Sequence, residues 1–116
     1  MFKPGSVNFG VTPTSWWNDD FPDIDIGIPY EQALSEMALA GYVGSSNSGK
    51  YPDVDTLKAA LDLRGLRISE PWTSTYFTIN KMHDKTVESF MKSLQFIKEM
   101  GGTDMVVAEF GRSSHL

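Results

Sequence analysis

The chain has 116 residues, with 15 acidic and 10 basic side chains, 41% hydrophobic residues and no cysteine, a composition typical of one globular domain. The lack of cysteine excludes a disulfide framework, a cysteine nucleophile and a thiolate metal site. The formal charge of -5 disfavours a nucleic-acid partner, because binding phosphates depends on basic surface. We expect a cytoplasmic protein without a membrane partner, since the sequence has neither a transmembrane-length apolar run nor the apolar stretch of a secretory signal.

Short apolar runs alternate with segments of helical periodicity along the chain. Residues 7–11, 42–45, 66–70 and 104–109 are predicted as strands, and Pro71 is expected to end the third. Three amphipathic helices are predicted between them. The first has Pro29 at its first position and ends at Gly41, the second runs from a cap at Asp53 to Gly65, and the third runs from a cap at Asp84 to Gly101, with Val87, Phe90, Met91, Leu94 and Ile97 on one face.

This order of about four strands and three helices predicts an α/β fold of parallel (β/α) units joined by right-handed crossovers. Two architectures fit it: a small open sheet, or the N-terminal half of a (β/α)8 barrel, whose full form takes about 250 residues. In both, functional residues gather where the strands end at their carboxyl side. The loops that follow the predicted strands are therefore the segments to examine.

The loop after the first strand combines aromatic, amide and acidic side chains. It contains Trp16, Trp17, Asn18 and Asp19, and four of the nine aspartates of the chain lie in residues 19–25. Aromatic faces stack on the C–H faces of sugars and cyclitols, and Asn and Asp hydrogen-bond the neighbouring hydroxyls. We predict a polyol site here. The alternative is a loop whose tryptophans cover the end of the sheet while its aspartates face water.

The loop after the second strand resembles part of a phosphate-binding loop. Residues 44–50 match G-x-x-x-x-G-K, with Gly49 followed by Lys50. The next residue is Tyr51, which replaces the Ser or Thr that would bind magnesium, and Pro52 delays the helix. A nucleotide site is therefore the lesser alternative, and Lys50 is interpreted as a cation that either contacts the ligand or faces solvent.

Two glutamates, Glu70 and Glu109, end the third and fourth predicted strands. Carboxylates in this position serve as a general acid and base, hold a substrate hydroxyl or help to bind a metal. The alternative for each is a glutamate at the rim, paired with a basic neighbour. No two histidines have the spacing of metal ligands, so the chain is not expected to contain a complete metal site.

Four segments carry a resemblance to a known family. They are GVTPTSWWNDD (10–20), YEQALSEMALAGY (30–42), GKYP (49–52) and LDLRGLRI (61–68). These segments resemble inosose dehydratases, which are xylose-isomerase-like TIM barrels of myo-inositol catabolism. The resemblance runs from about residue 8 to residue 111 and covers only the N-terminal part of such an enzyme, so residues 1–116 are interpreted as a partial TIM-barrel domain.

The resemblance implies a hydro-lyase that removes water from 2-keto-myo-inositol by abstracting a proton beside the ketone. A divalent metal, manganese or cobalt in this family, would act as a Lewis acid. Its ligands lie on later strands, outside this chain. The resemblance, combined with the strand-end positions, implies catalytic roles for Glu70 and Glu109, and substrate binding by Trp17, Asn18, Asp19 and Lys50.

The sequence departs from the family pattern at the end of the second strand, where Ser46 replaces the usual acidic residue. Because the later strands are absent, we expect the chain alone to be inactive. Half a barrel exposes two strand edges, so we expect it to form a homo-oligomer or to bind a complementing C-terminal half. A non-catalytic binding module of this kind is the principal alternative function.

Overall fold

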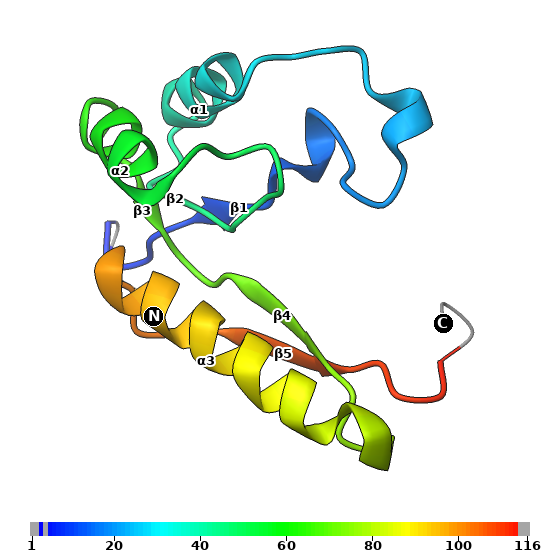
Figure 1. The fold of residues 1–116 in the computed structure, drawn as a ribbon. Helices are drawn as coiled ribbons and strands as arrows, with labels where there is room; N and C mark the ends of the chain where they lie inside the picture. Colours follow the sequence, from blue (N-terminus) through cyan, green and yellow to red (C-terminus); the bar gives the residue numbers. More distant parts are fainter. Residues whose placement is uncertain (1–2, 4, 114–116) are drawn as a thin grey trace.

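The computed structural model describes residue 3 and residues 5–113 (Figure 1). Within them lie three α-helices: α1 (Tyr30–Leu39), α2 (Val54–Asp62) and α3 (His83–Glu99). The strands are β1 (Gly10–Val11), β2 (Gly44–Ser45), β3 (Arg67–Ile68), β4 (Trp72–Thr75) and β5 (Val106–Glu109). Every strand pair is parallel, so the predicted α/β class is confirmed.

The strands form two small sheets instead of one. One sheet has the order β1-β2-β3, and the other pairs β4 with β5. The register of the second sheet joins Trp72 to Val106 and Thr75 to Glu109. The described part of the chain does not itself close into a barrel, since the two sheets share no strand pair.

The third strand is shorter than the predicted 66–70, and Pro71 separates it from a strand that was not predicted. The chain leaves β3 after Ile68 and enters β4 at Trp72, immediately after the proline. Pro71 has no N–H to donate, but its carbonyl accepts the N–H of Val106 at 3.0 Å, and the N–H of Trp72 donates to Oδ1 of Asn47 at 2.8 Å. The segment thus changes its strand partner from β2 to β5 around the proline, and a strand not anticipated from the sequence follows it.

The helices begin and end close to the predicted positions, with two corrections. Asp53 caps α2 by accepting the N–H of Thr56 at 3.1 Å, as predicted. Pro29 is the N-cap of α1 instead of its first helical residue. The predicted cap at Asp84 is wrong, because α3 begins at His83 after a 3-10 turn over Asn80–Met82 and has no side-chain cap.

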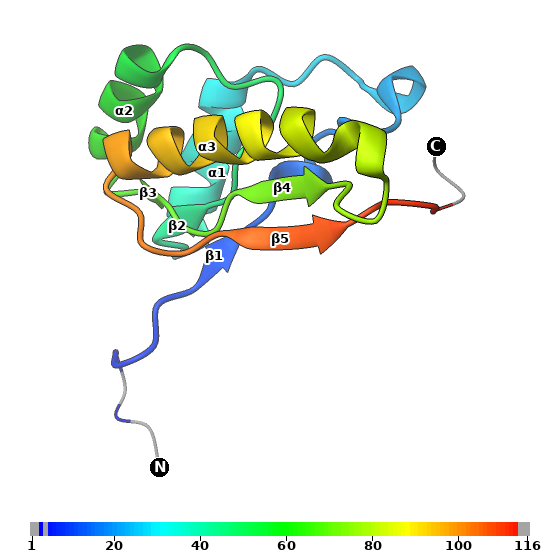
Figure 2. The ribbon, with the colours of Figure 1, turned by 60° about the horizontal axis from the view of Figure 1, so that its bottom comes forward.

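The core lies between the first three strands and the first two helices. The fully buried side chains of the core are apolar and face inward from these elements. They are Ala33, Leu34, Met37, Leu57, Leu61 and Ile68, and Trp17, Leu66 and Met100 belong to the same cluster. Figure 2 shows the helices on one side of the strands. No helix in the described residues is long and apolar enough to cross a membrane.

Only part of the predicted face of α3 is buried. Ile97 is 5% exposed, whereas Val87, Met91 and Leu94 are 42%, 57% and 39% exposed. Thr86, which the periodicity did not single out, is buried instead at 2%. The inward side of α3 is therefore rotated toward Thr86 and Ile97, and a flank of apolar side chains remains in contact with solvent.

Candidate functional site

The loops after β1 and β2 meet through a network centred on Ser48. The Nε1–H of Trp17 donates to Oγ of Ser48 at 2.7 Å. The Ser48 hydroxyl donates to the carboxylate of Asp19, with Oδ2 at 2.9 Å, and the Gly49 N–H donates to the same Oδ2 at 3.0 Å. A side chain from the first loop thus accepts both a hydroxyl and a backbone amide from the second, and this ties the two loops together.

Lys50 links the loops a second time. Its ammonium forms an ion pair with Oδ2 of Asp25, and the two side chains are only 29% and 24% exposed. The hydrogen bond from Lys50 is the main cause that lowers the pKa of Asp25, helped by the N–H of Gly27. The same ammonium lies over the Trp17 ring, 5.0 Å from its centroid, in the range of a cation–π contact.

The aromatic side chains beneath this cation are fixed by the core. Trp17 is only 4% exposed, and its ring meets that of Tyr51 edge-on at 6.1 Å between centroids. The Tyr51 hydroxyl lies 2.6 Å from Oγ of Ser45 at the end of β2, and burial raises the pKa of Tyr51. Trp17 is therefore a buried support for the loops and presents little free ring surface.

Three of the four predicted substrate-binding residues come together in this arrangement, namely Trp17, Asp19 and Lys50. Asn18 lies beside them in the chain, but its Oδ1 accepts the N–H of Asp20 at 2.9 Å and so closes a local turn. Asp25 and Ser48 were not predicted as site residues. Asp25 belongs to the acidic run of residues 19–25, whereas nothing in the local sequence distinguishes Ser48 from other loop serines.

Glu70 lies away from this cluster. It follows β3 and lines a hollow of about 420 Å³ at the N-terminal ends of the strands, together with Phe9, Arg67 and Asp104. Trp72 follows two residues later. It is 50% exposed, and its ring contacts that of Phe110 at 6.1 Å between centroids, so it presents a much larger accessible surface than Trp17.

Glu109 ends β5, as predicted, and its carboxylate is held in place by hydrogen bonds. Oε2 accepts the Thr75 hydroxyl at 3.0 Å and the Phe77 N–H at 2.9 Å. Oε1 accepts the Thr78 hydroxyl and the Gly111 N–H, both at 2.9 Å. Desolvation raises the pKa of Glu109, but these donors outweigh it and lower the pKa to about 2. The glutamate is thus a firmly ionised acceptor.

The structure does not bring the two predicted catalytic glutamates together. By the register Trp72 to Val106, Glu70 is level with Asp104, and both line the same hollow. Glu109 lies five residues further along the sheet (109 minus 104), which at about 3.3 Å per residue is roughly 16 Å. The two carboxylates therefore occupy opposite ends of the β4–β5 pair.

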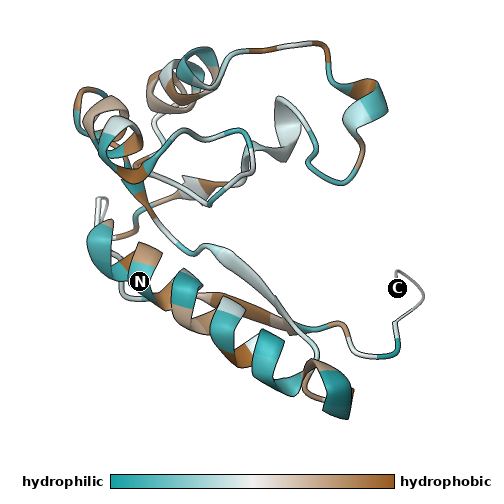
Figure 3. Cartoon of the chain, viewed as in Figure 1, coloured by the Kyte–Doolittle hydropathy of each residue, from teal (hydrophilic) through white to brown (hydrophobic). Residues whose placement is uncertain are grey.

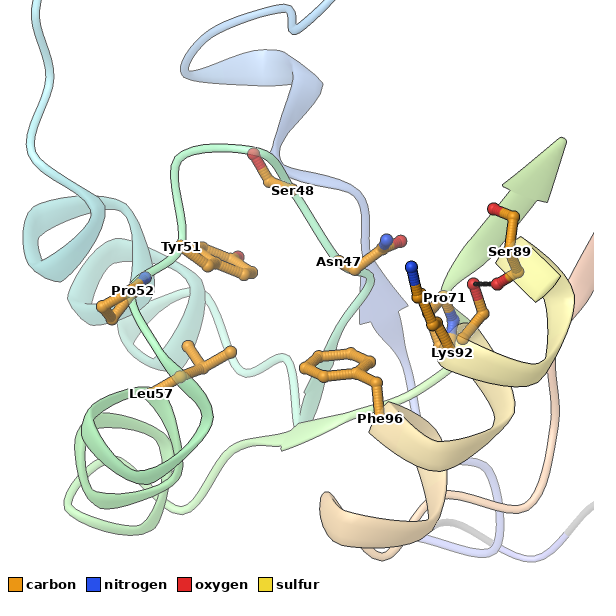
Figure 4. A pocket seen from close by; sticks show the side chains of 10 residues that line it. Asn47, Ser48, Tyr51, Pro52, Leu57, Pro71, Ser89, Lys92 and Phe96 are labelled. Carbon is orange, nitrogen blue, oxygen red and sulfur yellow. Dashed lines mark hydrogen bonds between the residues drawn. The ribbon is translucent and has the colours of Figure 1, made fainter. Parts of the chain in front are cut away.

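A second cavity, of about 310 Å³, separates the loop after β2 from α3. Figure 4 shows Tyr51 and Leu57 on one side of it and Phe96 and Lys92 on the other. Ser48, which joins Trp17 to Asp19, also lines this cavity. The hydrogen-bond network of the two loops therefore borders the cavity.

The described residues hold no group of three or more His, Cys, Asp or Glu side chains placed to bind a metal ion. Asp19 and Asp25 are occupied by hydrogen-bond donors, and Glu70 and Glu109 are far apart. These residues by themselves do not fit the divalent metal that the family resemblance implies.

The segment that matches part of a phosphate-binding loop has a different arrangement. Gly44 belongs to β2, and α2 begins only at Val54. The Gly49 N–H binds Asp19, and the Lys50 ammonium binds Asp25. Two donors that a phosphate would need are thus already bound to carboxylates, so the structure offers no support for the nucleotide alternative.

Comparison with known proteins gives a consistent set of relatives, although no family model matches the chain. The chain is 46% identical over 114 residues to the inosose dehydratase of Geobacillus thermodenitrificans. It is 44% identical over the same length to inosose dehydratase 1 of Bacillus cereus and to the inosose dehydratase of Clostridium beijerinckii. Each match covers 97% of this chain and 38% of the relative. The chain is similar to the N-terminal part of inosose dehydratases.

This similarity to inosose dehydratases includes both loops of the site, because the matches cover almost the whole chain. The chain spans 38% of the length of these curated relatives. The similarity therefore covers the elements described above and does not extend to the rest of the relatives' sequences.

Proposed function

We propose that the loops after β1 and β2 bind a polyhydroxylated cyclic ketone, and that the chain supplies this binding region to inosose dehydratase chemistry. The observation that carries the proposal is the meeting of Trp17, Asp19 and Lys50, which come from two loops at the same end of a parallel sheet. The similarity to inosose dehydratases supports 2-keto-myo-inositol as the ligand.

The chemistry of the cluster suits a neutral, hydroxylated ligand. The Lys50 ammonium is a hydrogen-bond donor for a ketone or hydroxyl oxygen, and Asp19 is an acceptor for a hydroxyl. Both groups are bound to partners within the protein. A ligand that binds here must therefore break these internal contacts and form hydrogen bonds of its own to the Lys50 ammonium and the Asp19 carboxylate.

The dehydration itself requires loss of a proton from the carbon beside the ketone and departure of hydroxide from the next carbon. A carbon–carbon double bond forms, and the hydroxide leaves as water after it accepts a proton. Glu70 and Glu109 stay our predicted catalytic carboxylates. Glu109, with a pKa of about 2, is a weak base and suits holding a hydroxyl. Glu70 lines the hollow at the N-terminal ends of the strands, so proton transfer by Glu70 requires a ligand that reaches that end of the sheet.

We further propose that the fold is the N-terminal half of a (β/α)8 barrel and that the chain alone does not catalyse the reaction. Parallel strands with helices on one side, and relatives of which the chain spans 38%, support this. We assign the manganese or cobalt of the family resemblance to residues outside this sequence. The metal would polarise the ketone.

A calorimetric titration of the 116-residue chain with 2-keto-myo-inositol tests the binding role. We expect saturable binding that weakens at least tenfold in Lys50→Ala, because the only cation over Trp17 in the described residues would be lost. Lys58→Ala is the matched control, since Lys58 is an exposed lysine of α2. Absence of binding, or equal binding by both variants, would contradict the proposal.

An activity assay tests the separate statement that the chain is not sufficient for catalysis. Dehydration of 2-keto-myo-inositol is followed with added manganese or cobalt, and we expect no turnover above a protein-free blank. Turnover by the purified chain that is lost in Glu70→Gln would show instead that the described residues hold a complete active site.

A further inference from the structure

Of the three tryptophans in the chain, Trp72 has the most accessible side chain. It is 50% exposed, whereas Trp17 is 4% exposed. Trp16 is half-buried, and its Nε1–H donates to the carboxylate of Glu36. A polyol ring that stacks on an aromatic face therefore finds little free surface on the two tryptophans of the first loop and much more on Trp72.

The alternation of side chains along β4 places the Trp72 ring on the face opposite α3. Thr73 and Thr75 are 4% and 1% exposed and lie on the side of β4 that packs against α3. Successive side chains of a strand point to opposite faces, so Trp72 and Ser74 share the other face. Figure 3 shows β4 in near-white tones of intermediate hydropathy beside the hydrophobic β5. The open face of β4 thus combines an aromatic ring with a hydroxyl group.

Contacts on two sides hold the Trp72 ring in place. Its Nε1–H donates to Oγ of Ser74 at 3.2 Å. The Phe110 ring meets it edge-on, with 6.1 Å between centroids and an angle of 72° between the planes. The backbone N–H of Phe110 donates to the Thr75 carbonyl at 2.7 Å, which fixes Phe110 against the end of β4. A ring that is already ordered loses little conformational freedom when a ligand packs on it.

The backbone of Trp72 is bound to the loop that carries part of the polyol cluster. Its N–H donates to Oδ1 of Asn47 at 2.8 Å. Asn47 directly precedes Ser48, whose hydroxyl donates to Asp19. The start of β4 therefore lies beside the loop after β2, and two consecutive loop residues connect Trp72 with the polar side chains of the candidate site.

We propose that Trp72 is the stacking platform for the polyol ring and so a specificity-determining residue of the candidate site. This inference rests on the proposed function. The hydroxyls of 2-keto-myo-inositol are equatorial, so its axial C–H bonds form two apolar ring faces. One face would lie on the indole and bury apolar surface of both partners, while the hydroxyls at the ring edge stay available to the loops. An axial hydroxyl on that face would be buried without a hydrogen-bond partner, which selects against it.

Calorimetric titration of the 116-residue chain with 2-keto-myo-inositol tests the platform. Trp72→Leu keeps an apolar side chain but removes the flat ring, and we expect it to weaken binding at least tenfold. Trp72→Phe retains a flat ring and should weaken binding clearly less. Phe77→Leu is the matched control, because Phe77 is 47% exposed and its ring contacts His83 at the start of α3. It should leave binding unchanged.

Proton NMR of the ligand gives a second readout, which needs no variant. A ligand stacked on an indole has C–H protons within the ring current, so the wild-type chain should shift them upfield. Unshifted C–H protons, or equal binding by Trp72→Leu and Phe77→Leu, would overturn the platform. If Lys50→Ala still weakened binding in that case, the proposed function would stand without the platform. Absence of any binding by the wild-type chain would overturn both.

Discussion

The ammonium nitrogen of Lys50 lies 5.0 Å from the centroid of the Trp17 ring, so a cation from the loop after β2 covers a buried aromatic side chain from the loop after β1. The two residues are 33 positions apart in the sequence (50 minus 17). Their contact, together with the hydrogen bonds of Ser48 and Asp19, holds two otherwise irregular loops in one arrangement.

Replacing Lys50 by methionine should reduce the stability of the chain. Methionine preserves much of the apolar stem but removes the charge above Trp17. We expect the free energy of unfolding to fall by at least about 0.5–1 kcal/mol, the contribution of a cation–π contact at a partly exposed site, because loss of the ion pair with Asp25 adds to this effect. Urea unfolding followed by tryptophan fluorescence measures it, with Lys58→Met as the control. Equal midpoints for the two variants would contradict the structural role of the contact.

Asp25→Asn should loosen the first loop without unfolding the core. The loop side chains Phe21, Ile24 and Ile26 are 61%, 68% and 82% exposed, so apolar packing contributes little to holding this segment. The ion pair between Asp25 and Lys50 connects this segment to the loop after β2. Amide hydrogens in residues 20–28 should therefore exchange faster in Asp25→Asn than in the wild type. Asp23→Asn is the control from the same turn and should leave these rates unchanged.

Glu109→Gln should remove part of the acid sensitivity of the fold. The pKa of Glu109 is lowered from 4.5 to about 2, so the unfolded chain binds a proton here more readily than the folded chain. The resulting stabilisation is fully present above about pH 4.5 and is lost as the pH falls toward 2. Between these values, urea midpoints should fall less steeply in the variant. Parallel curves for both proteins would contradict the hydrogen-bonded state of this carboxylate.

Gly111→Ala should destabilise the end of the second sheet. A methyl group at Gly111 would overlap the Thr78 hydroxyl and the Glu109 carboxylate. The methyl group would push these side-chain ends aside and disturb the hydrogen bond between the Thr78 hydroxyl and the Glu109 carboxylate, so we expect a modestly lower midpoint of thermal or urea unfolding. Gly49→Ala is the matched control, because its methyl group would lie 3.6 Å from Asp19, an ordinary contact distance. Similar losses in both variants would contradict the packing at Gly111.

Local patterns predicted much of the secondary structure. The recurrence of apolar residues identified α1 and α2, and the Asp53 cap of α2 needs only the chain from Asp53 to Thr56. Such features are visible in a sequence because they depend on residues three or four positions apart. The same local logic placed Asp84 as the cap of α3 and missed β4, because the 3-10 turn and the pairing with β5 involve more distant residues.

The candidate site shows the same division between local and long-range information. The sequence alone determined that Trp17, Asp19 and Lys50 follow parallel strands, and parallel strands bring such loops to one end of a sheet. Only the tertiary structure decided that Ser48 joins two of them, that Asp25 takes the Lys50 ammonium, and that Glu70 and Glu109 stand apart. These contacts and separations involve residues that are distant in the sequence. They depend on strand pairing, because it determines which backbone segments lie side by side.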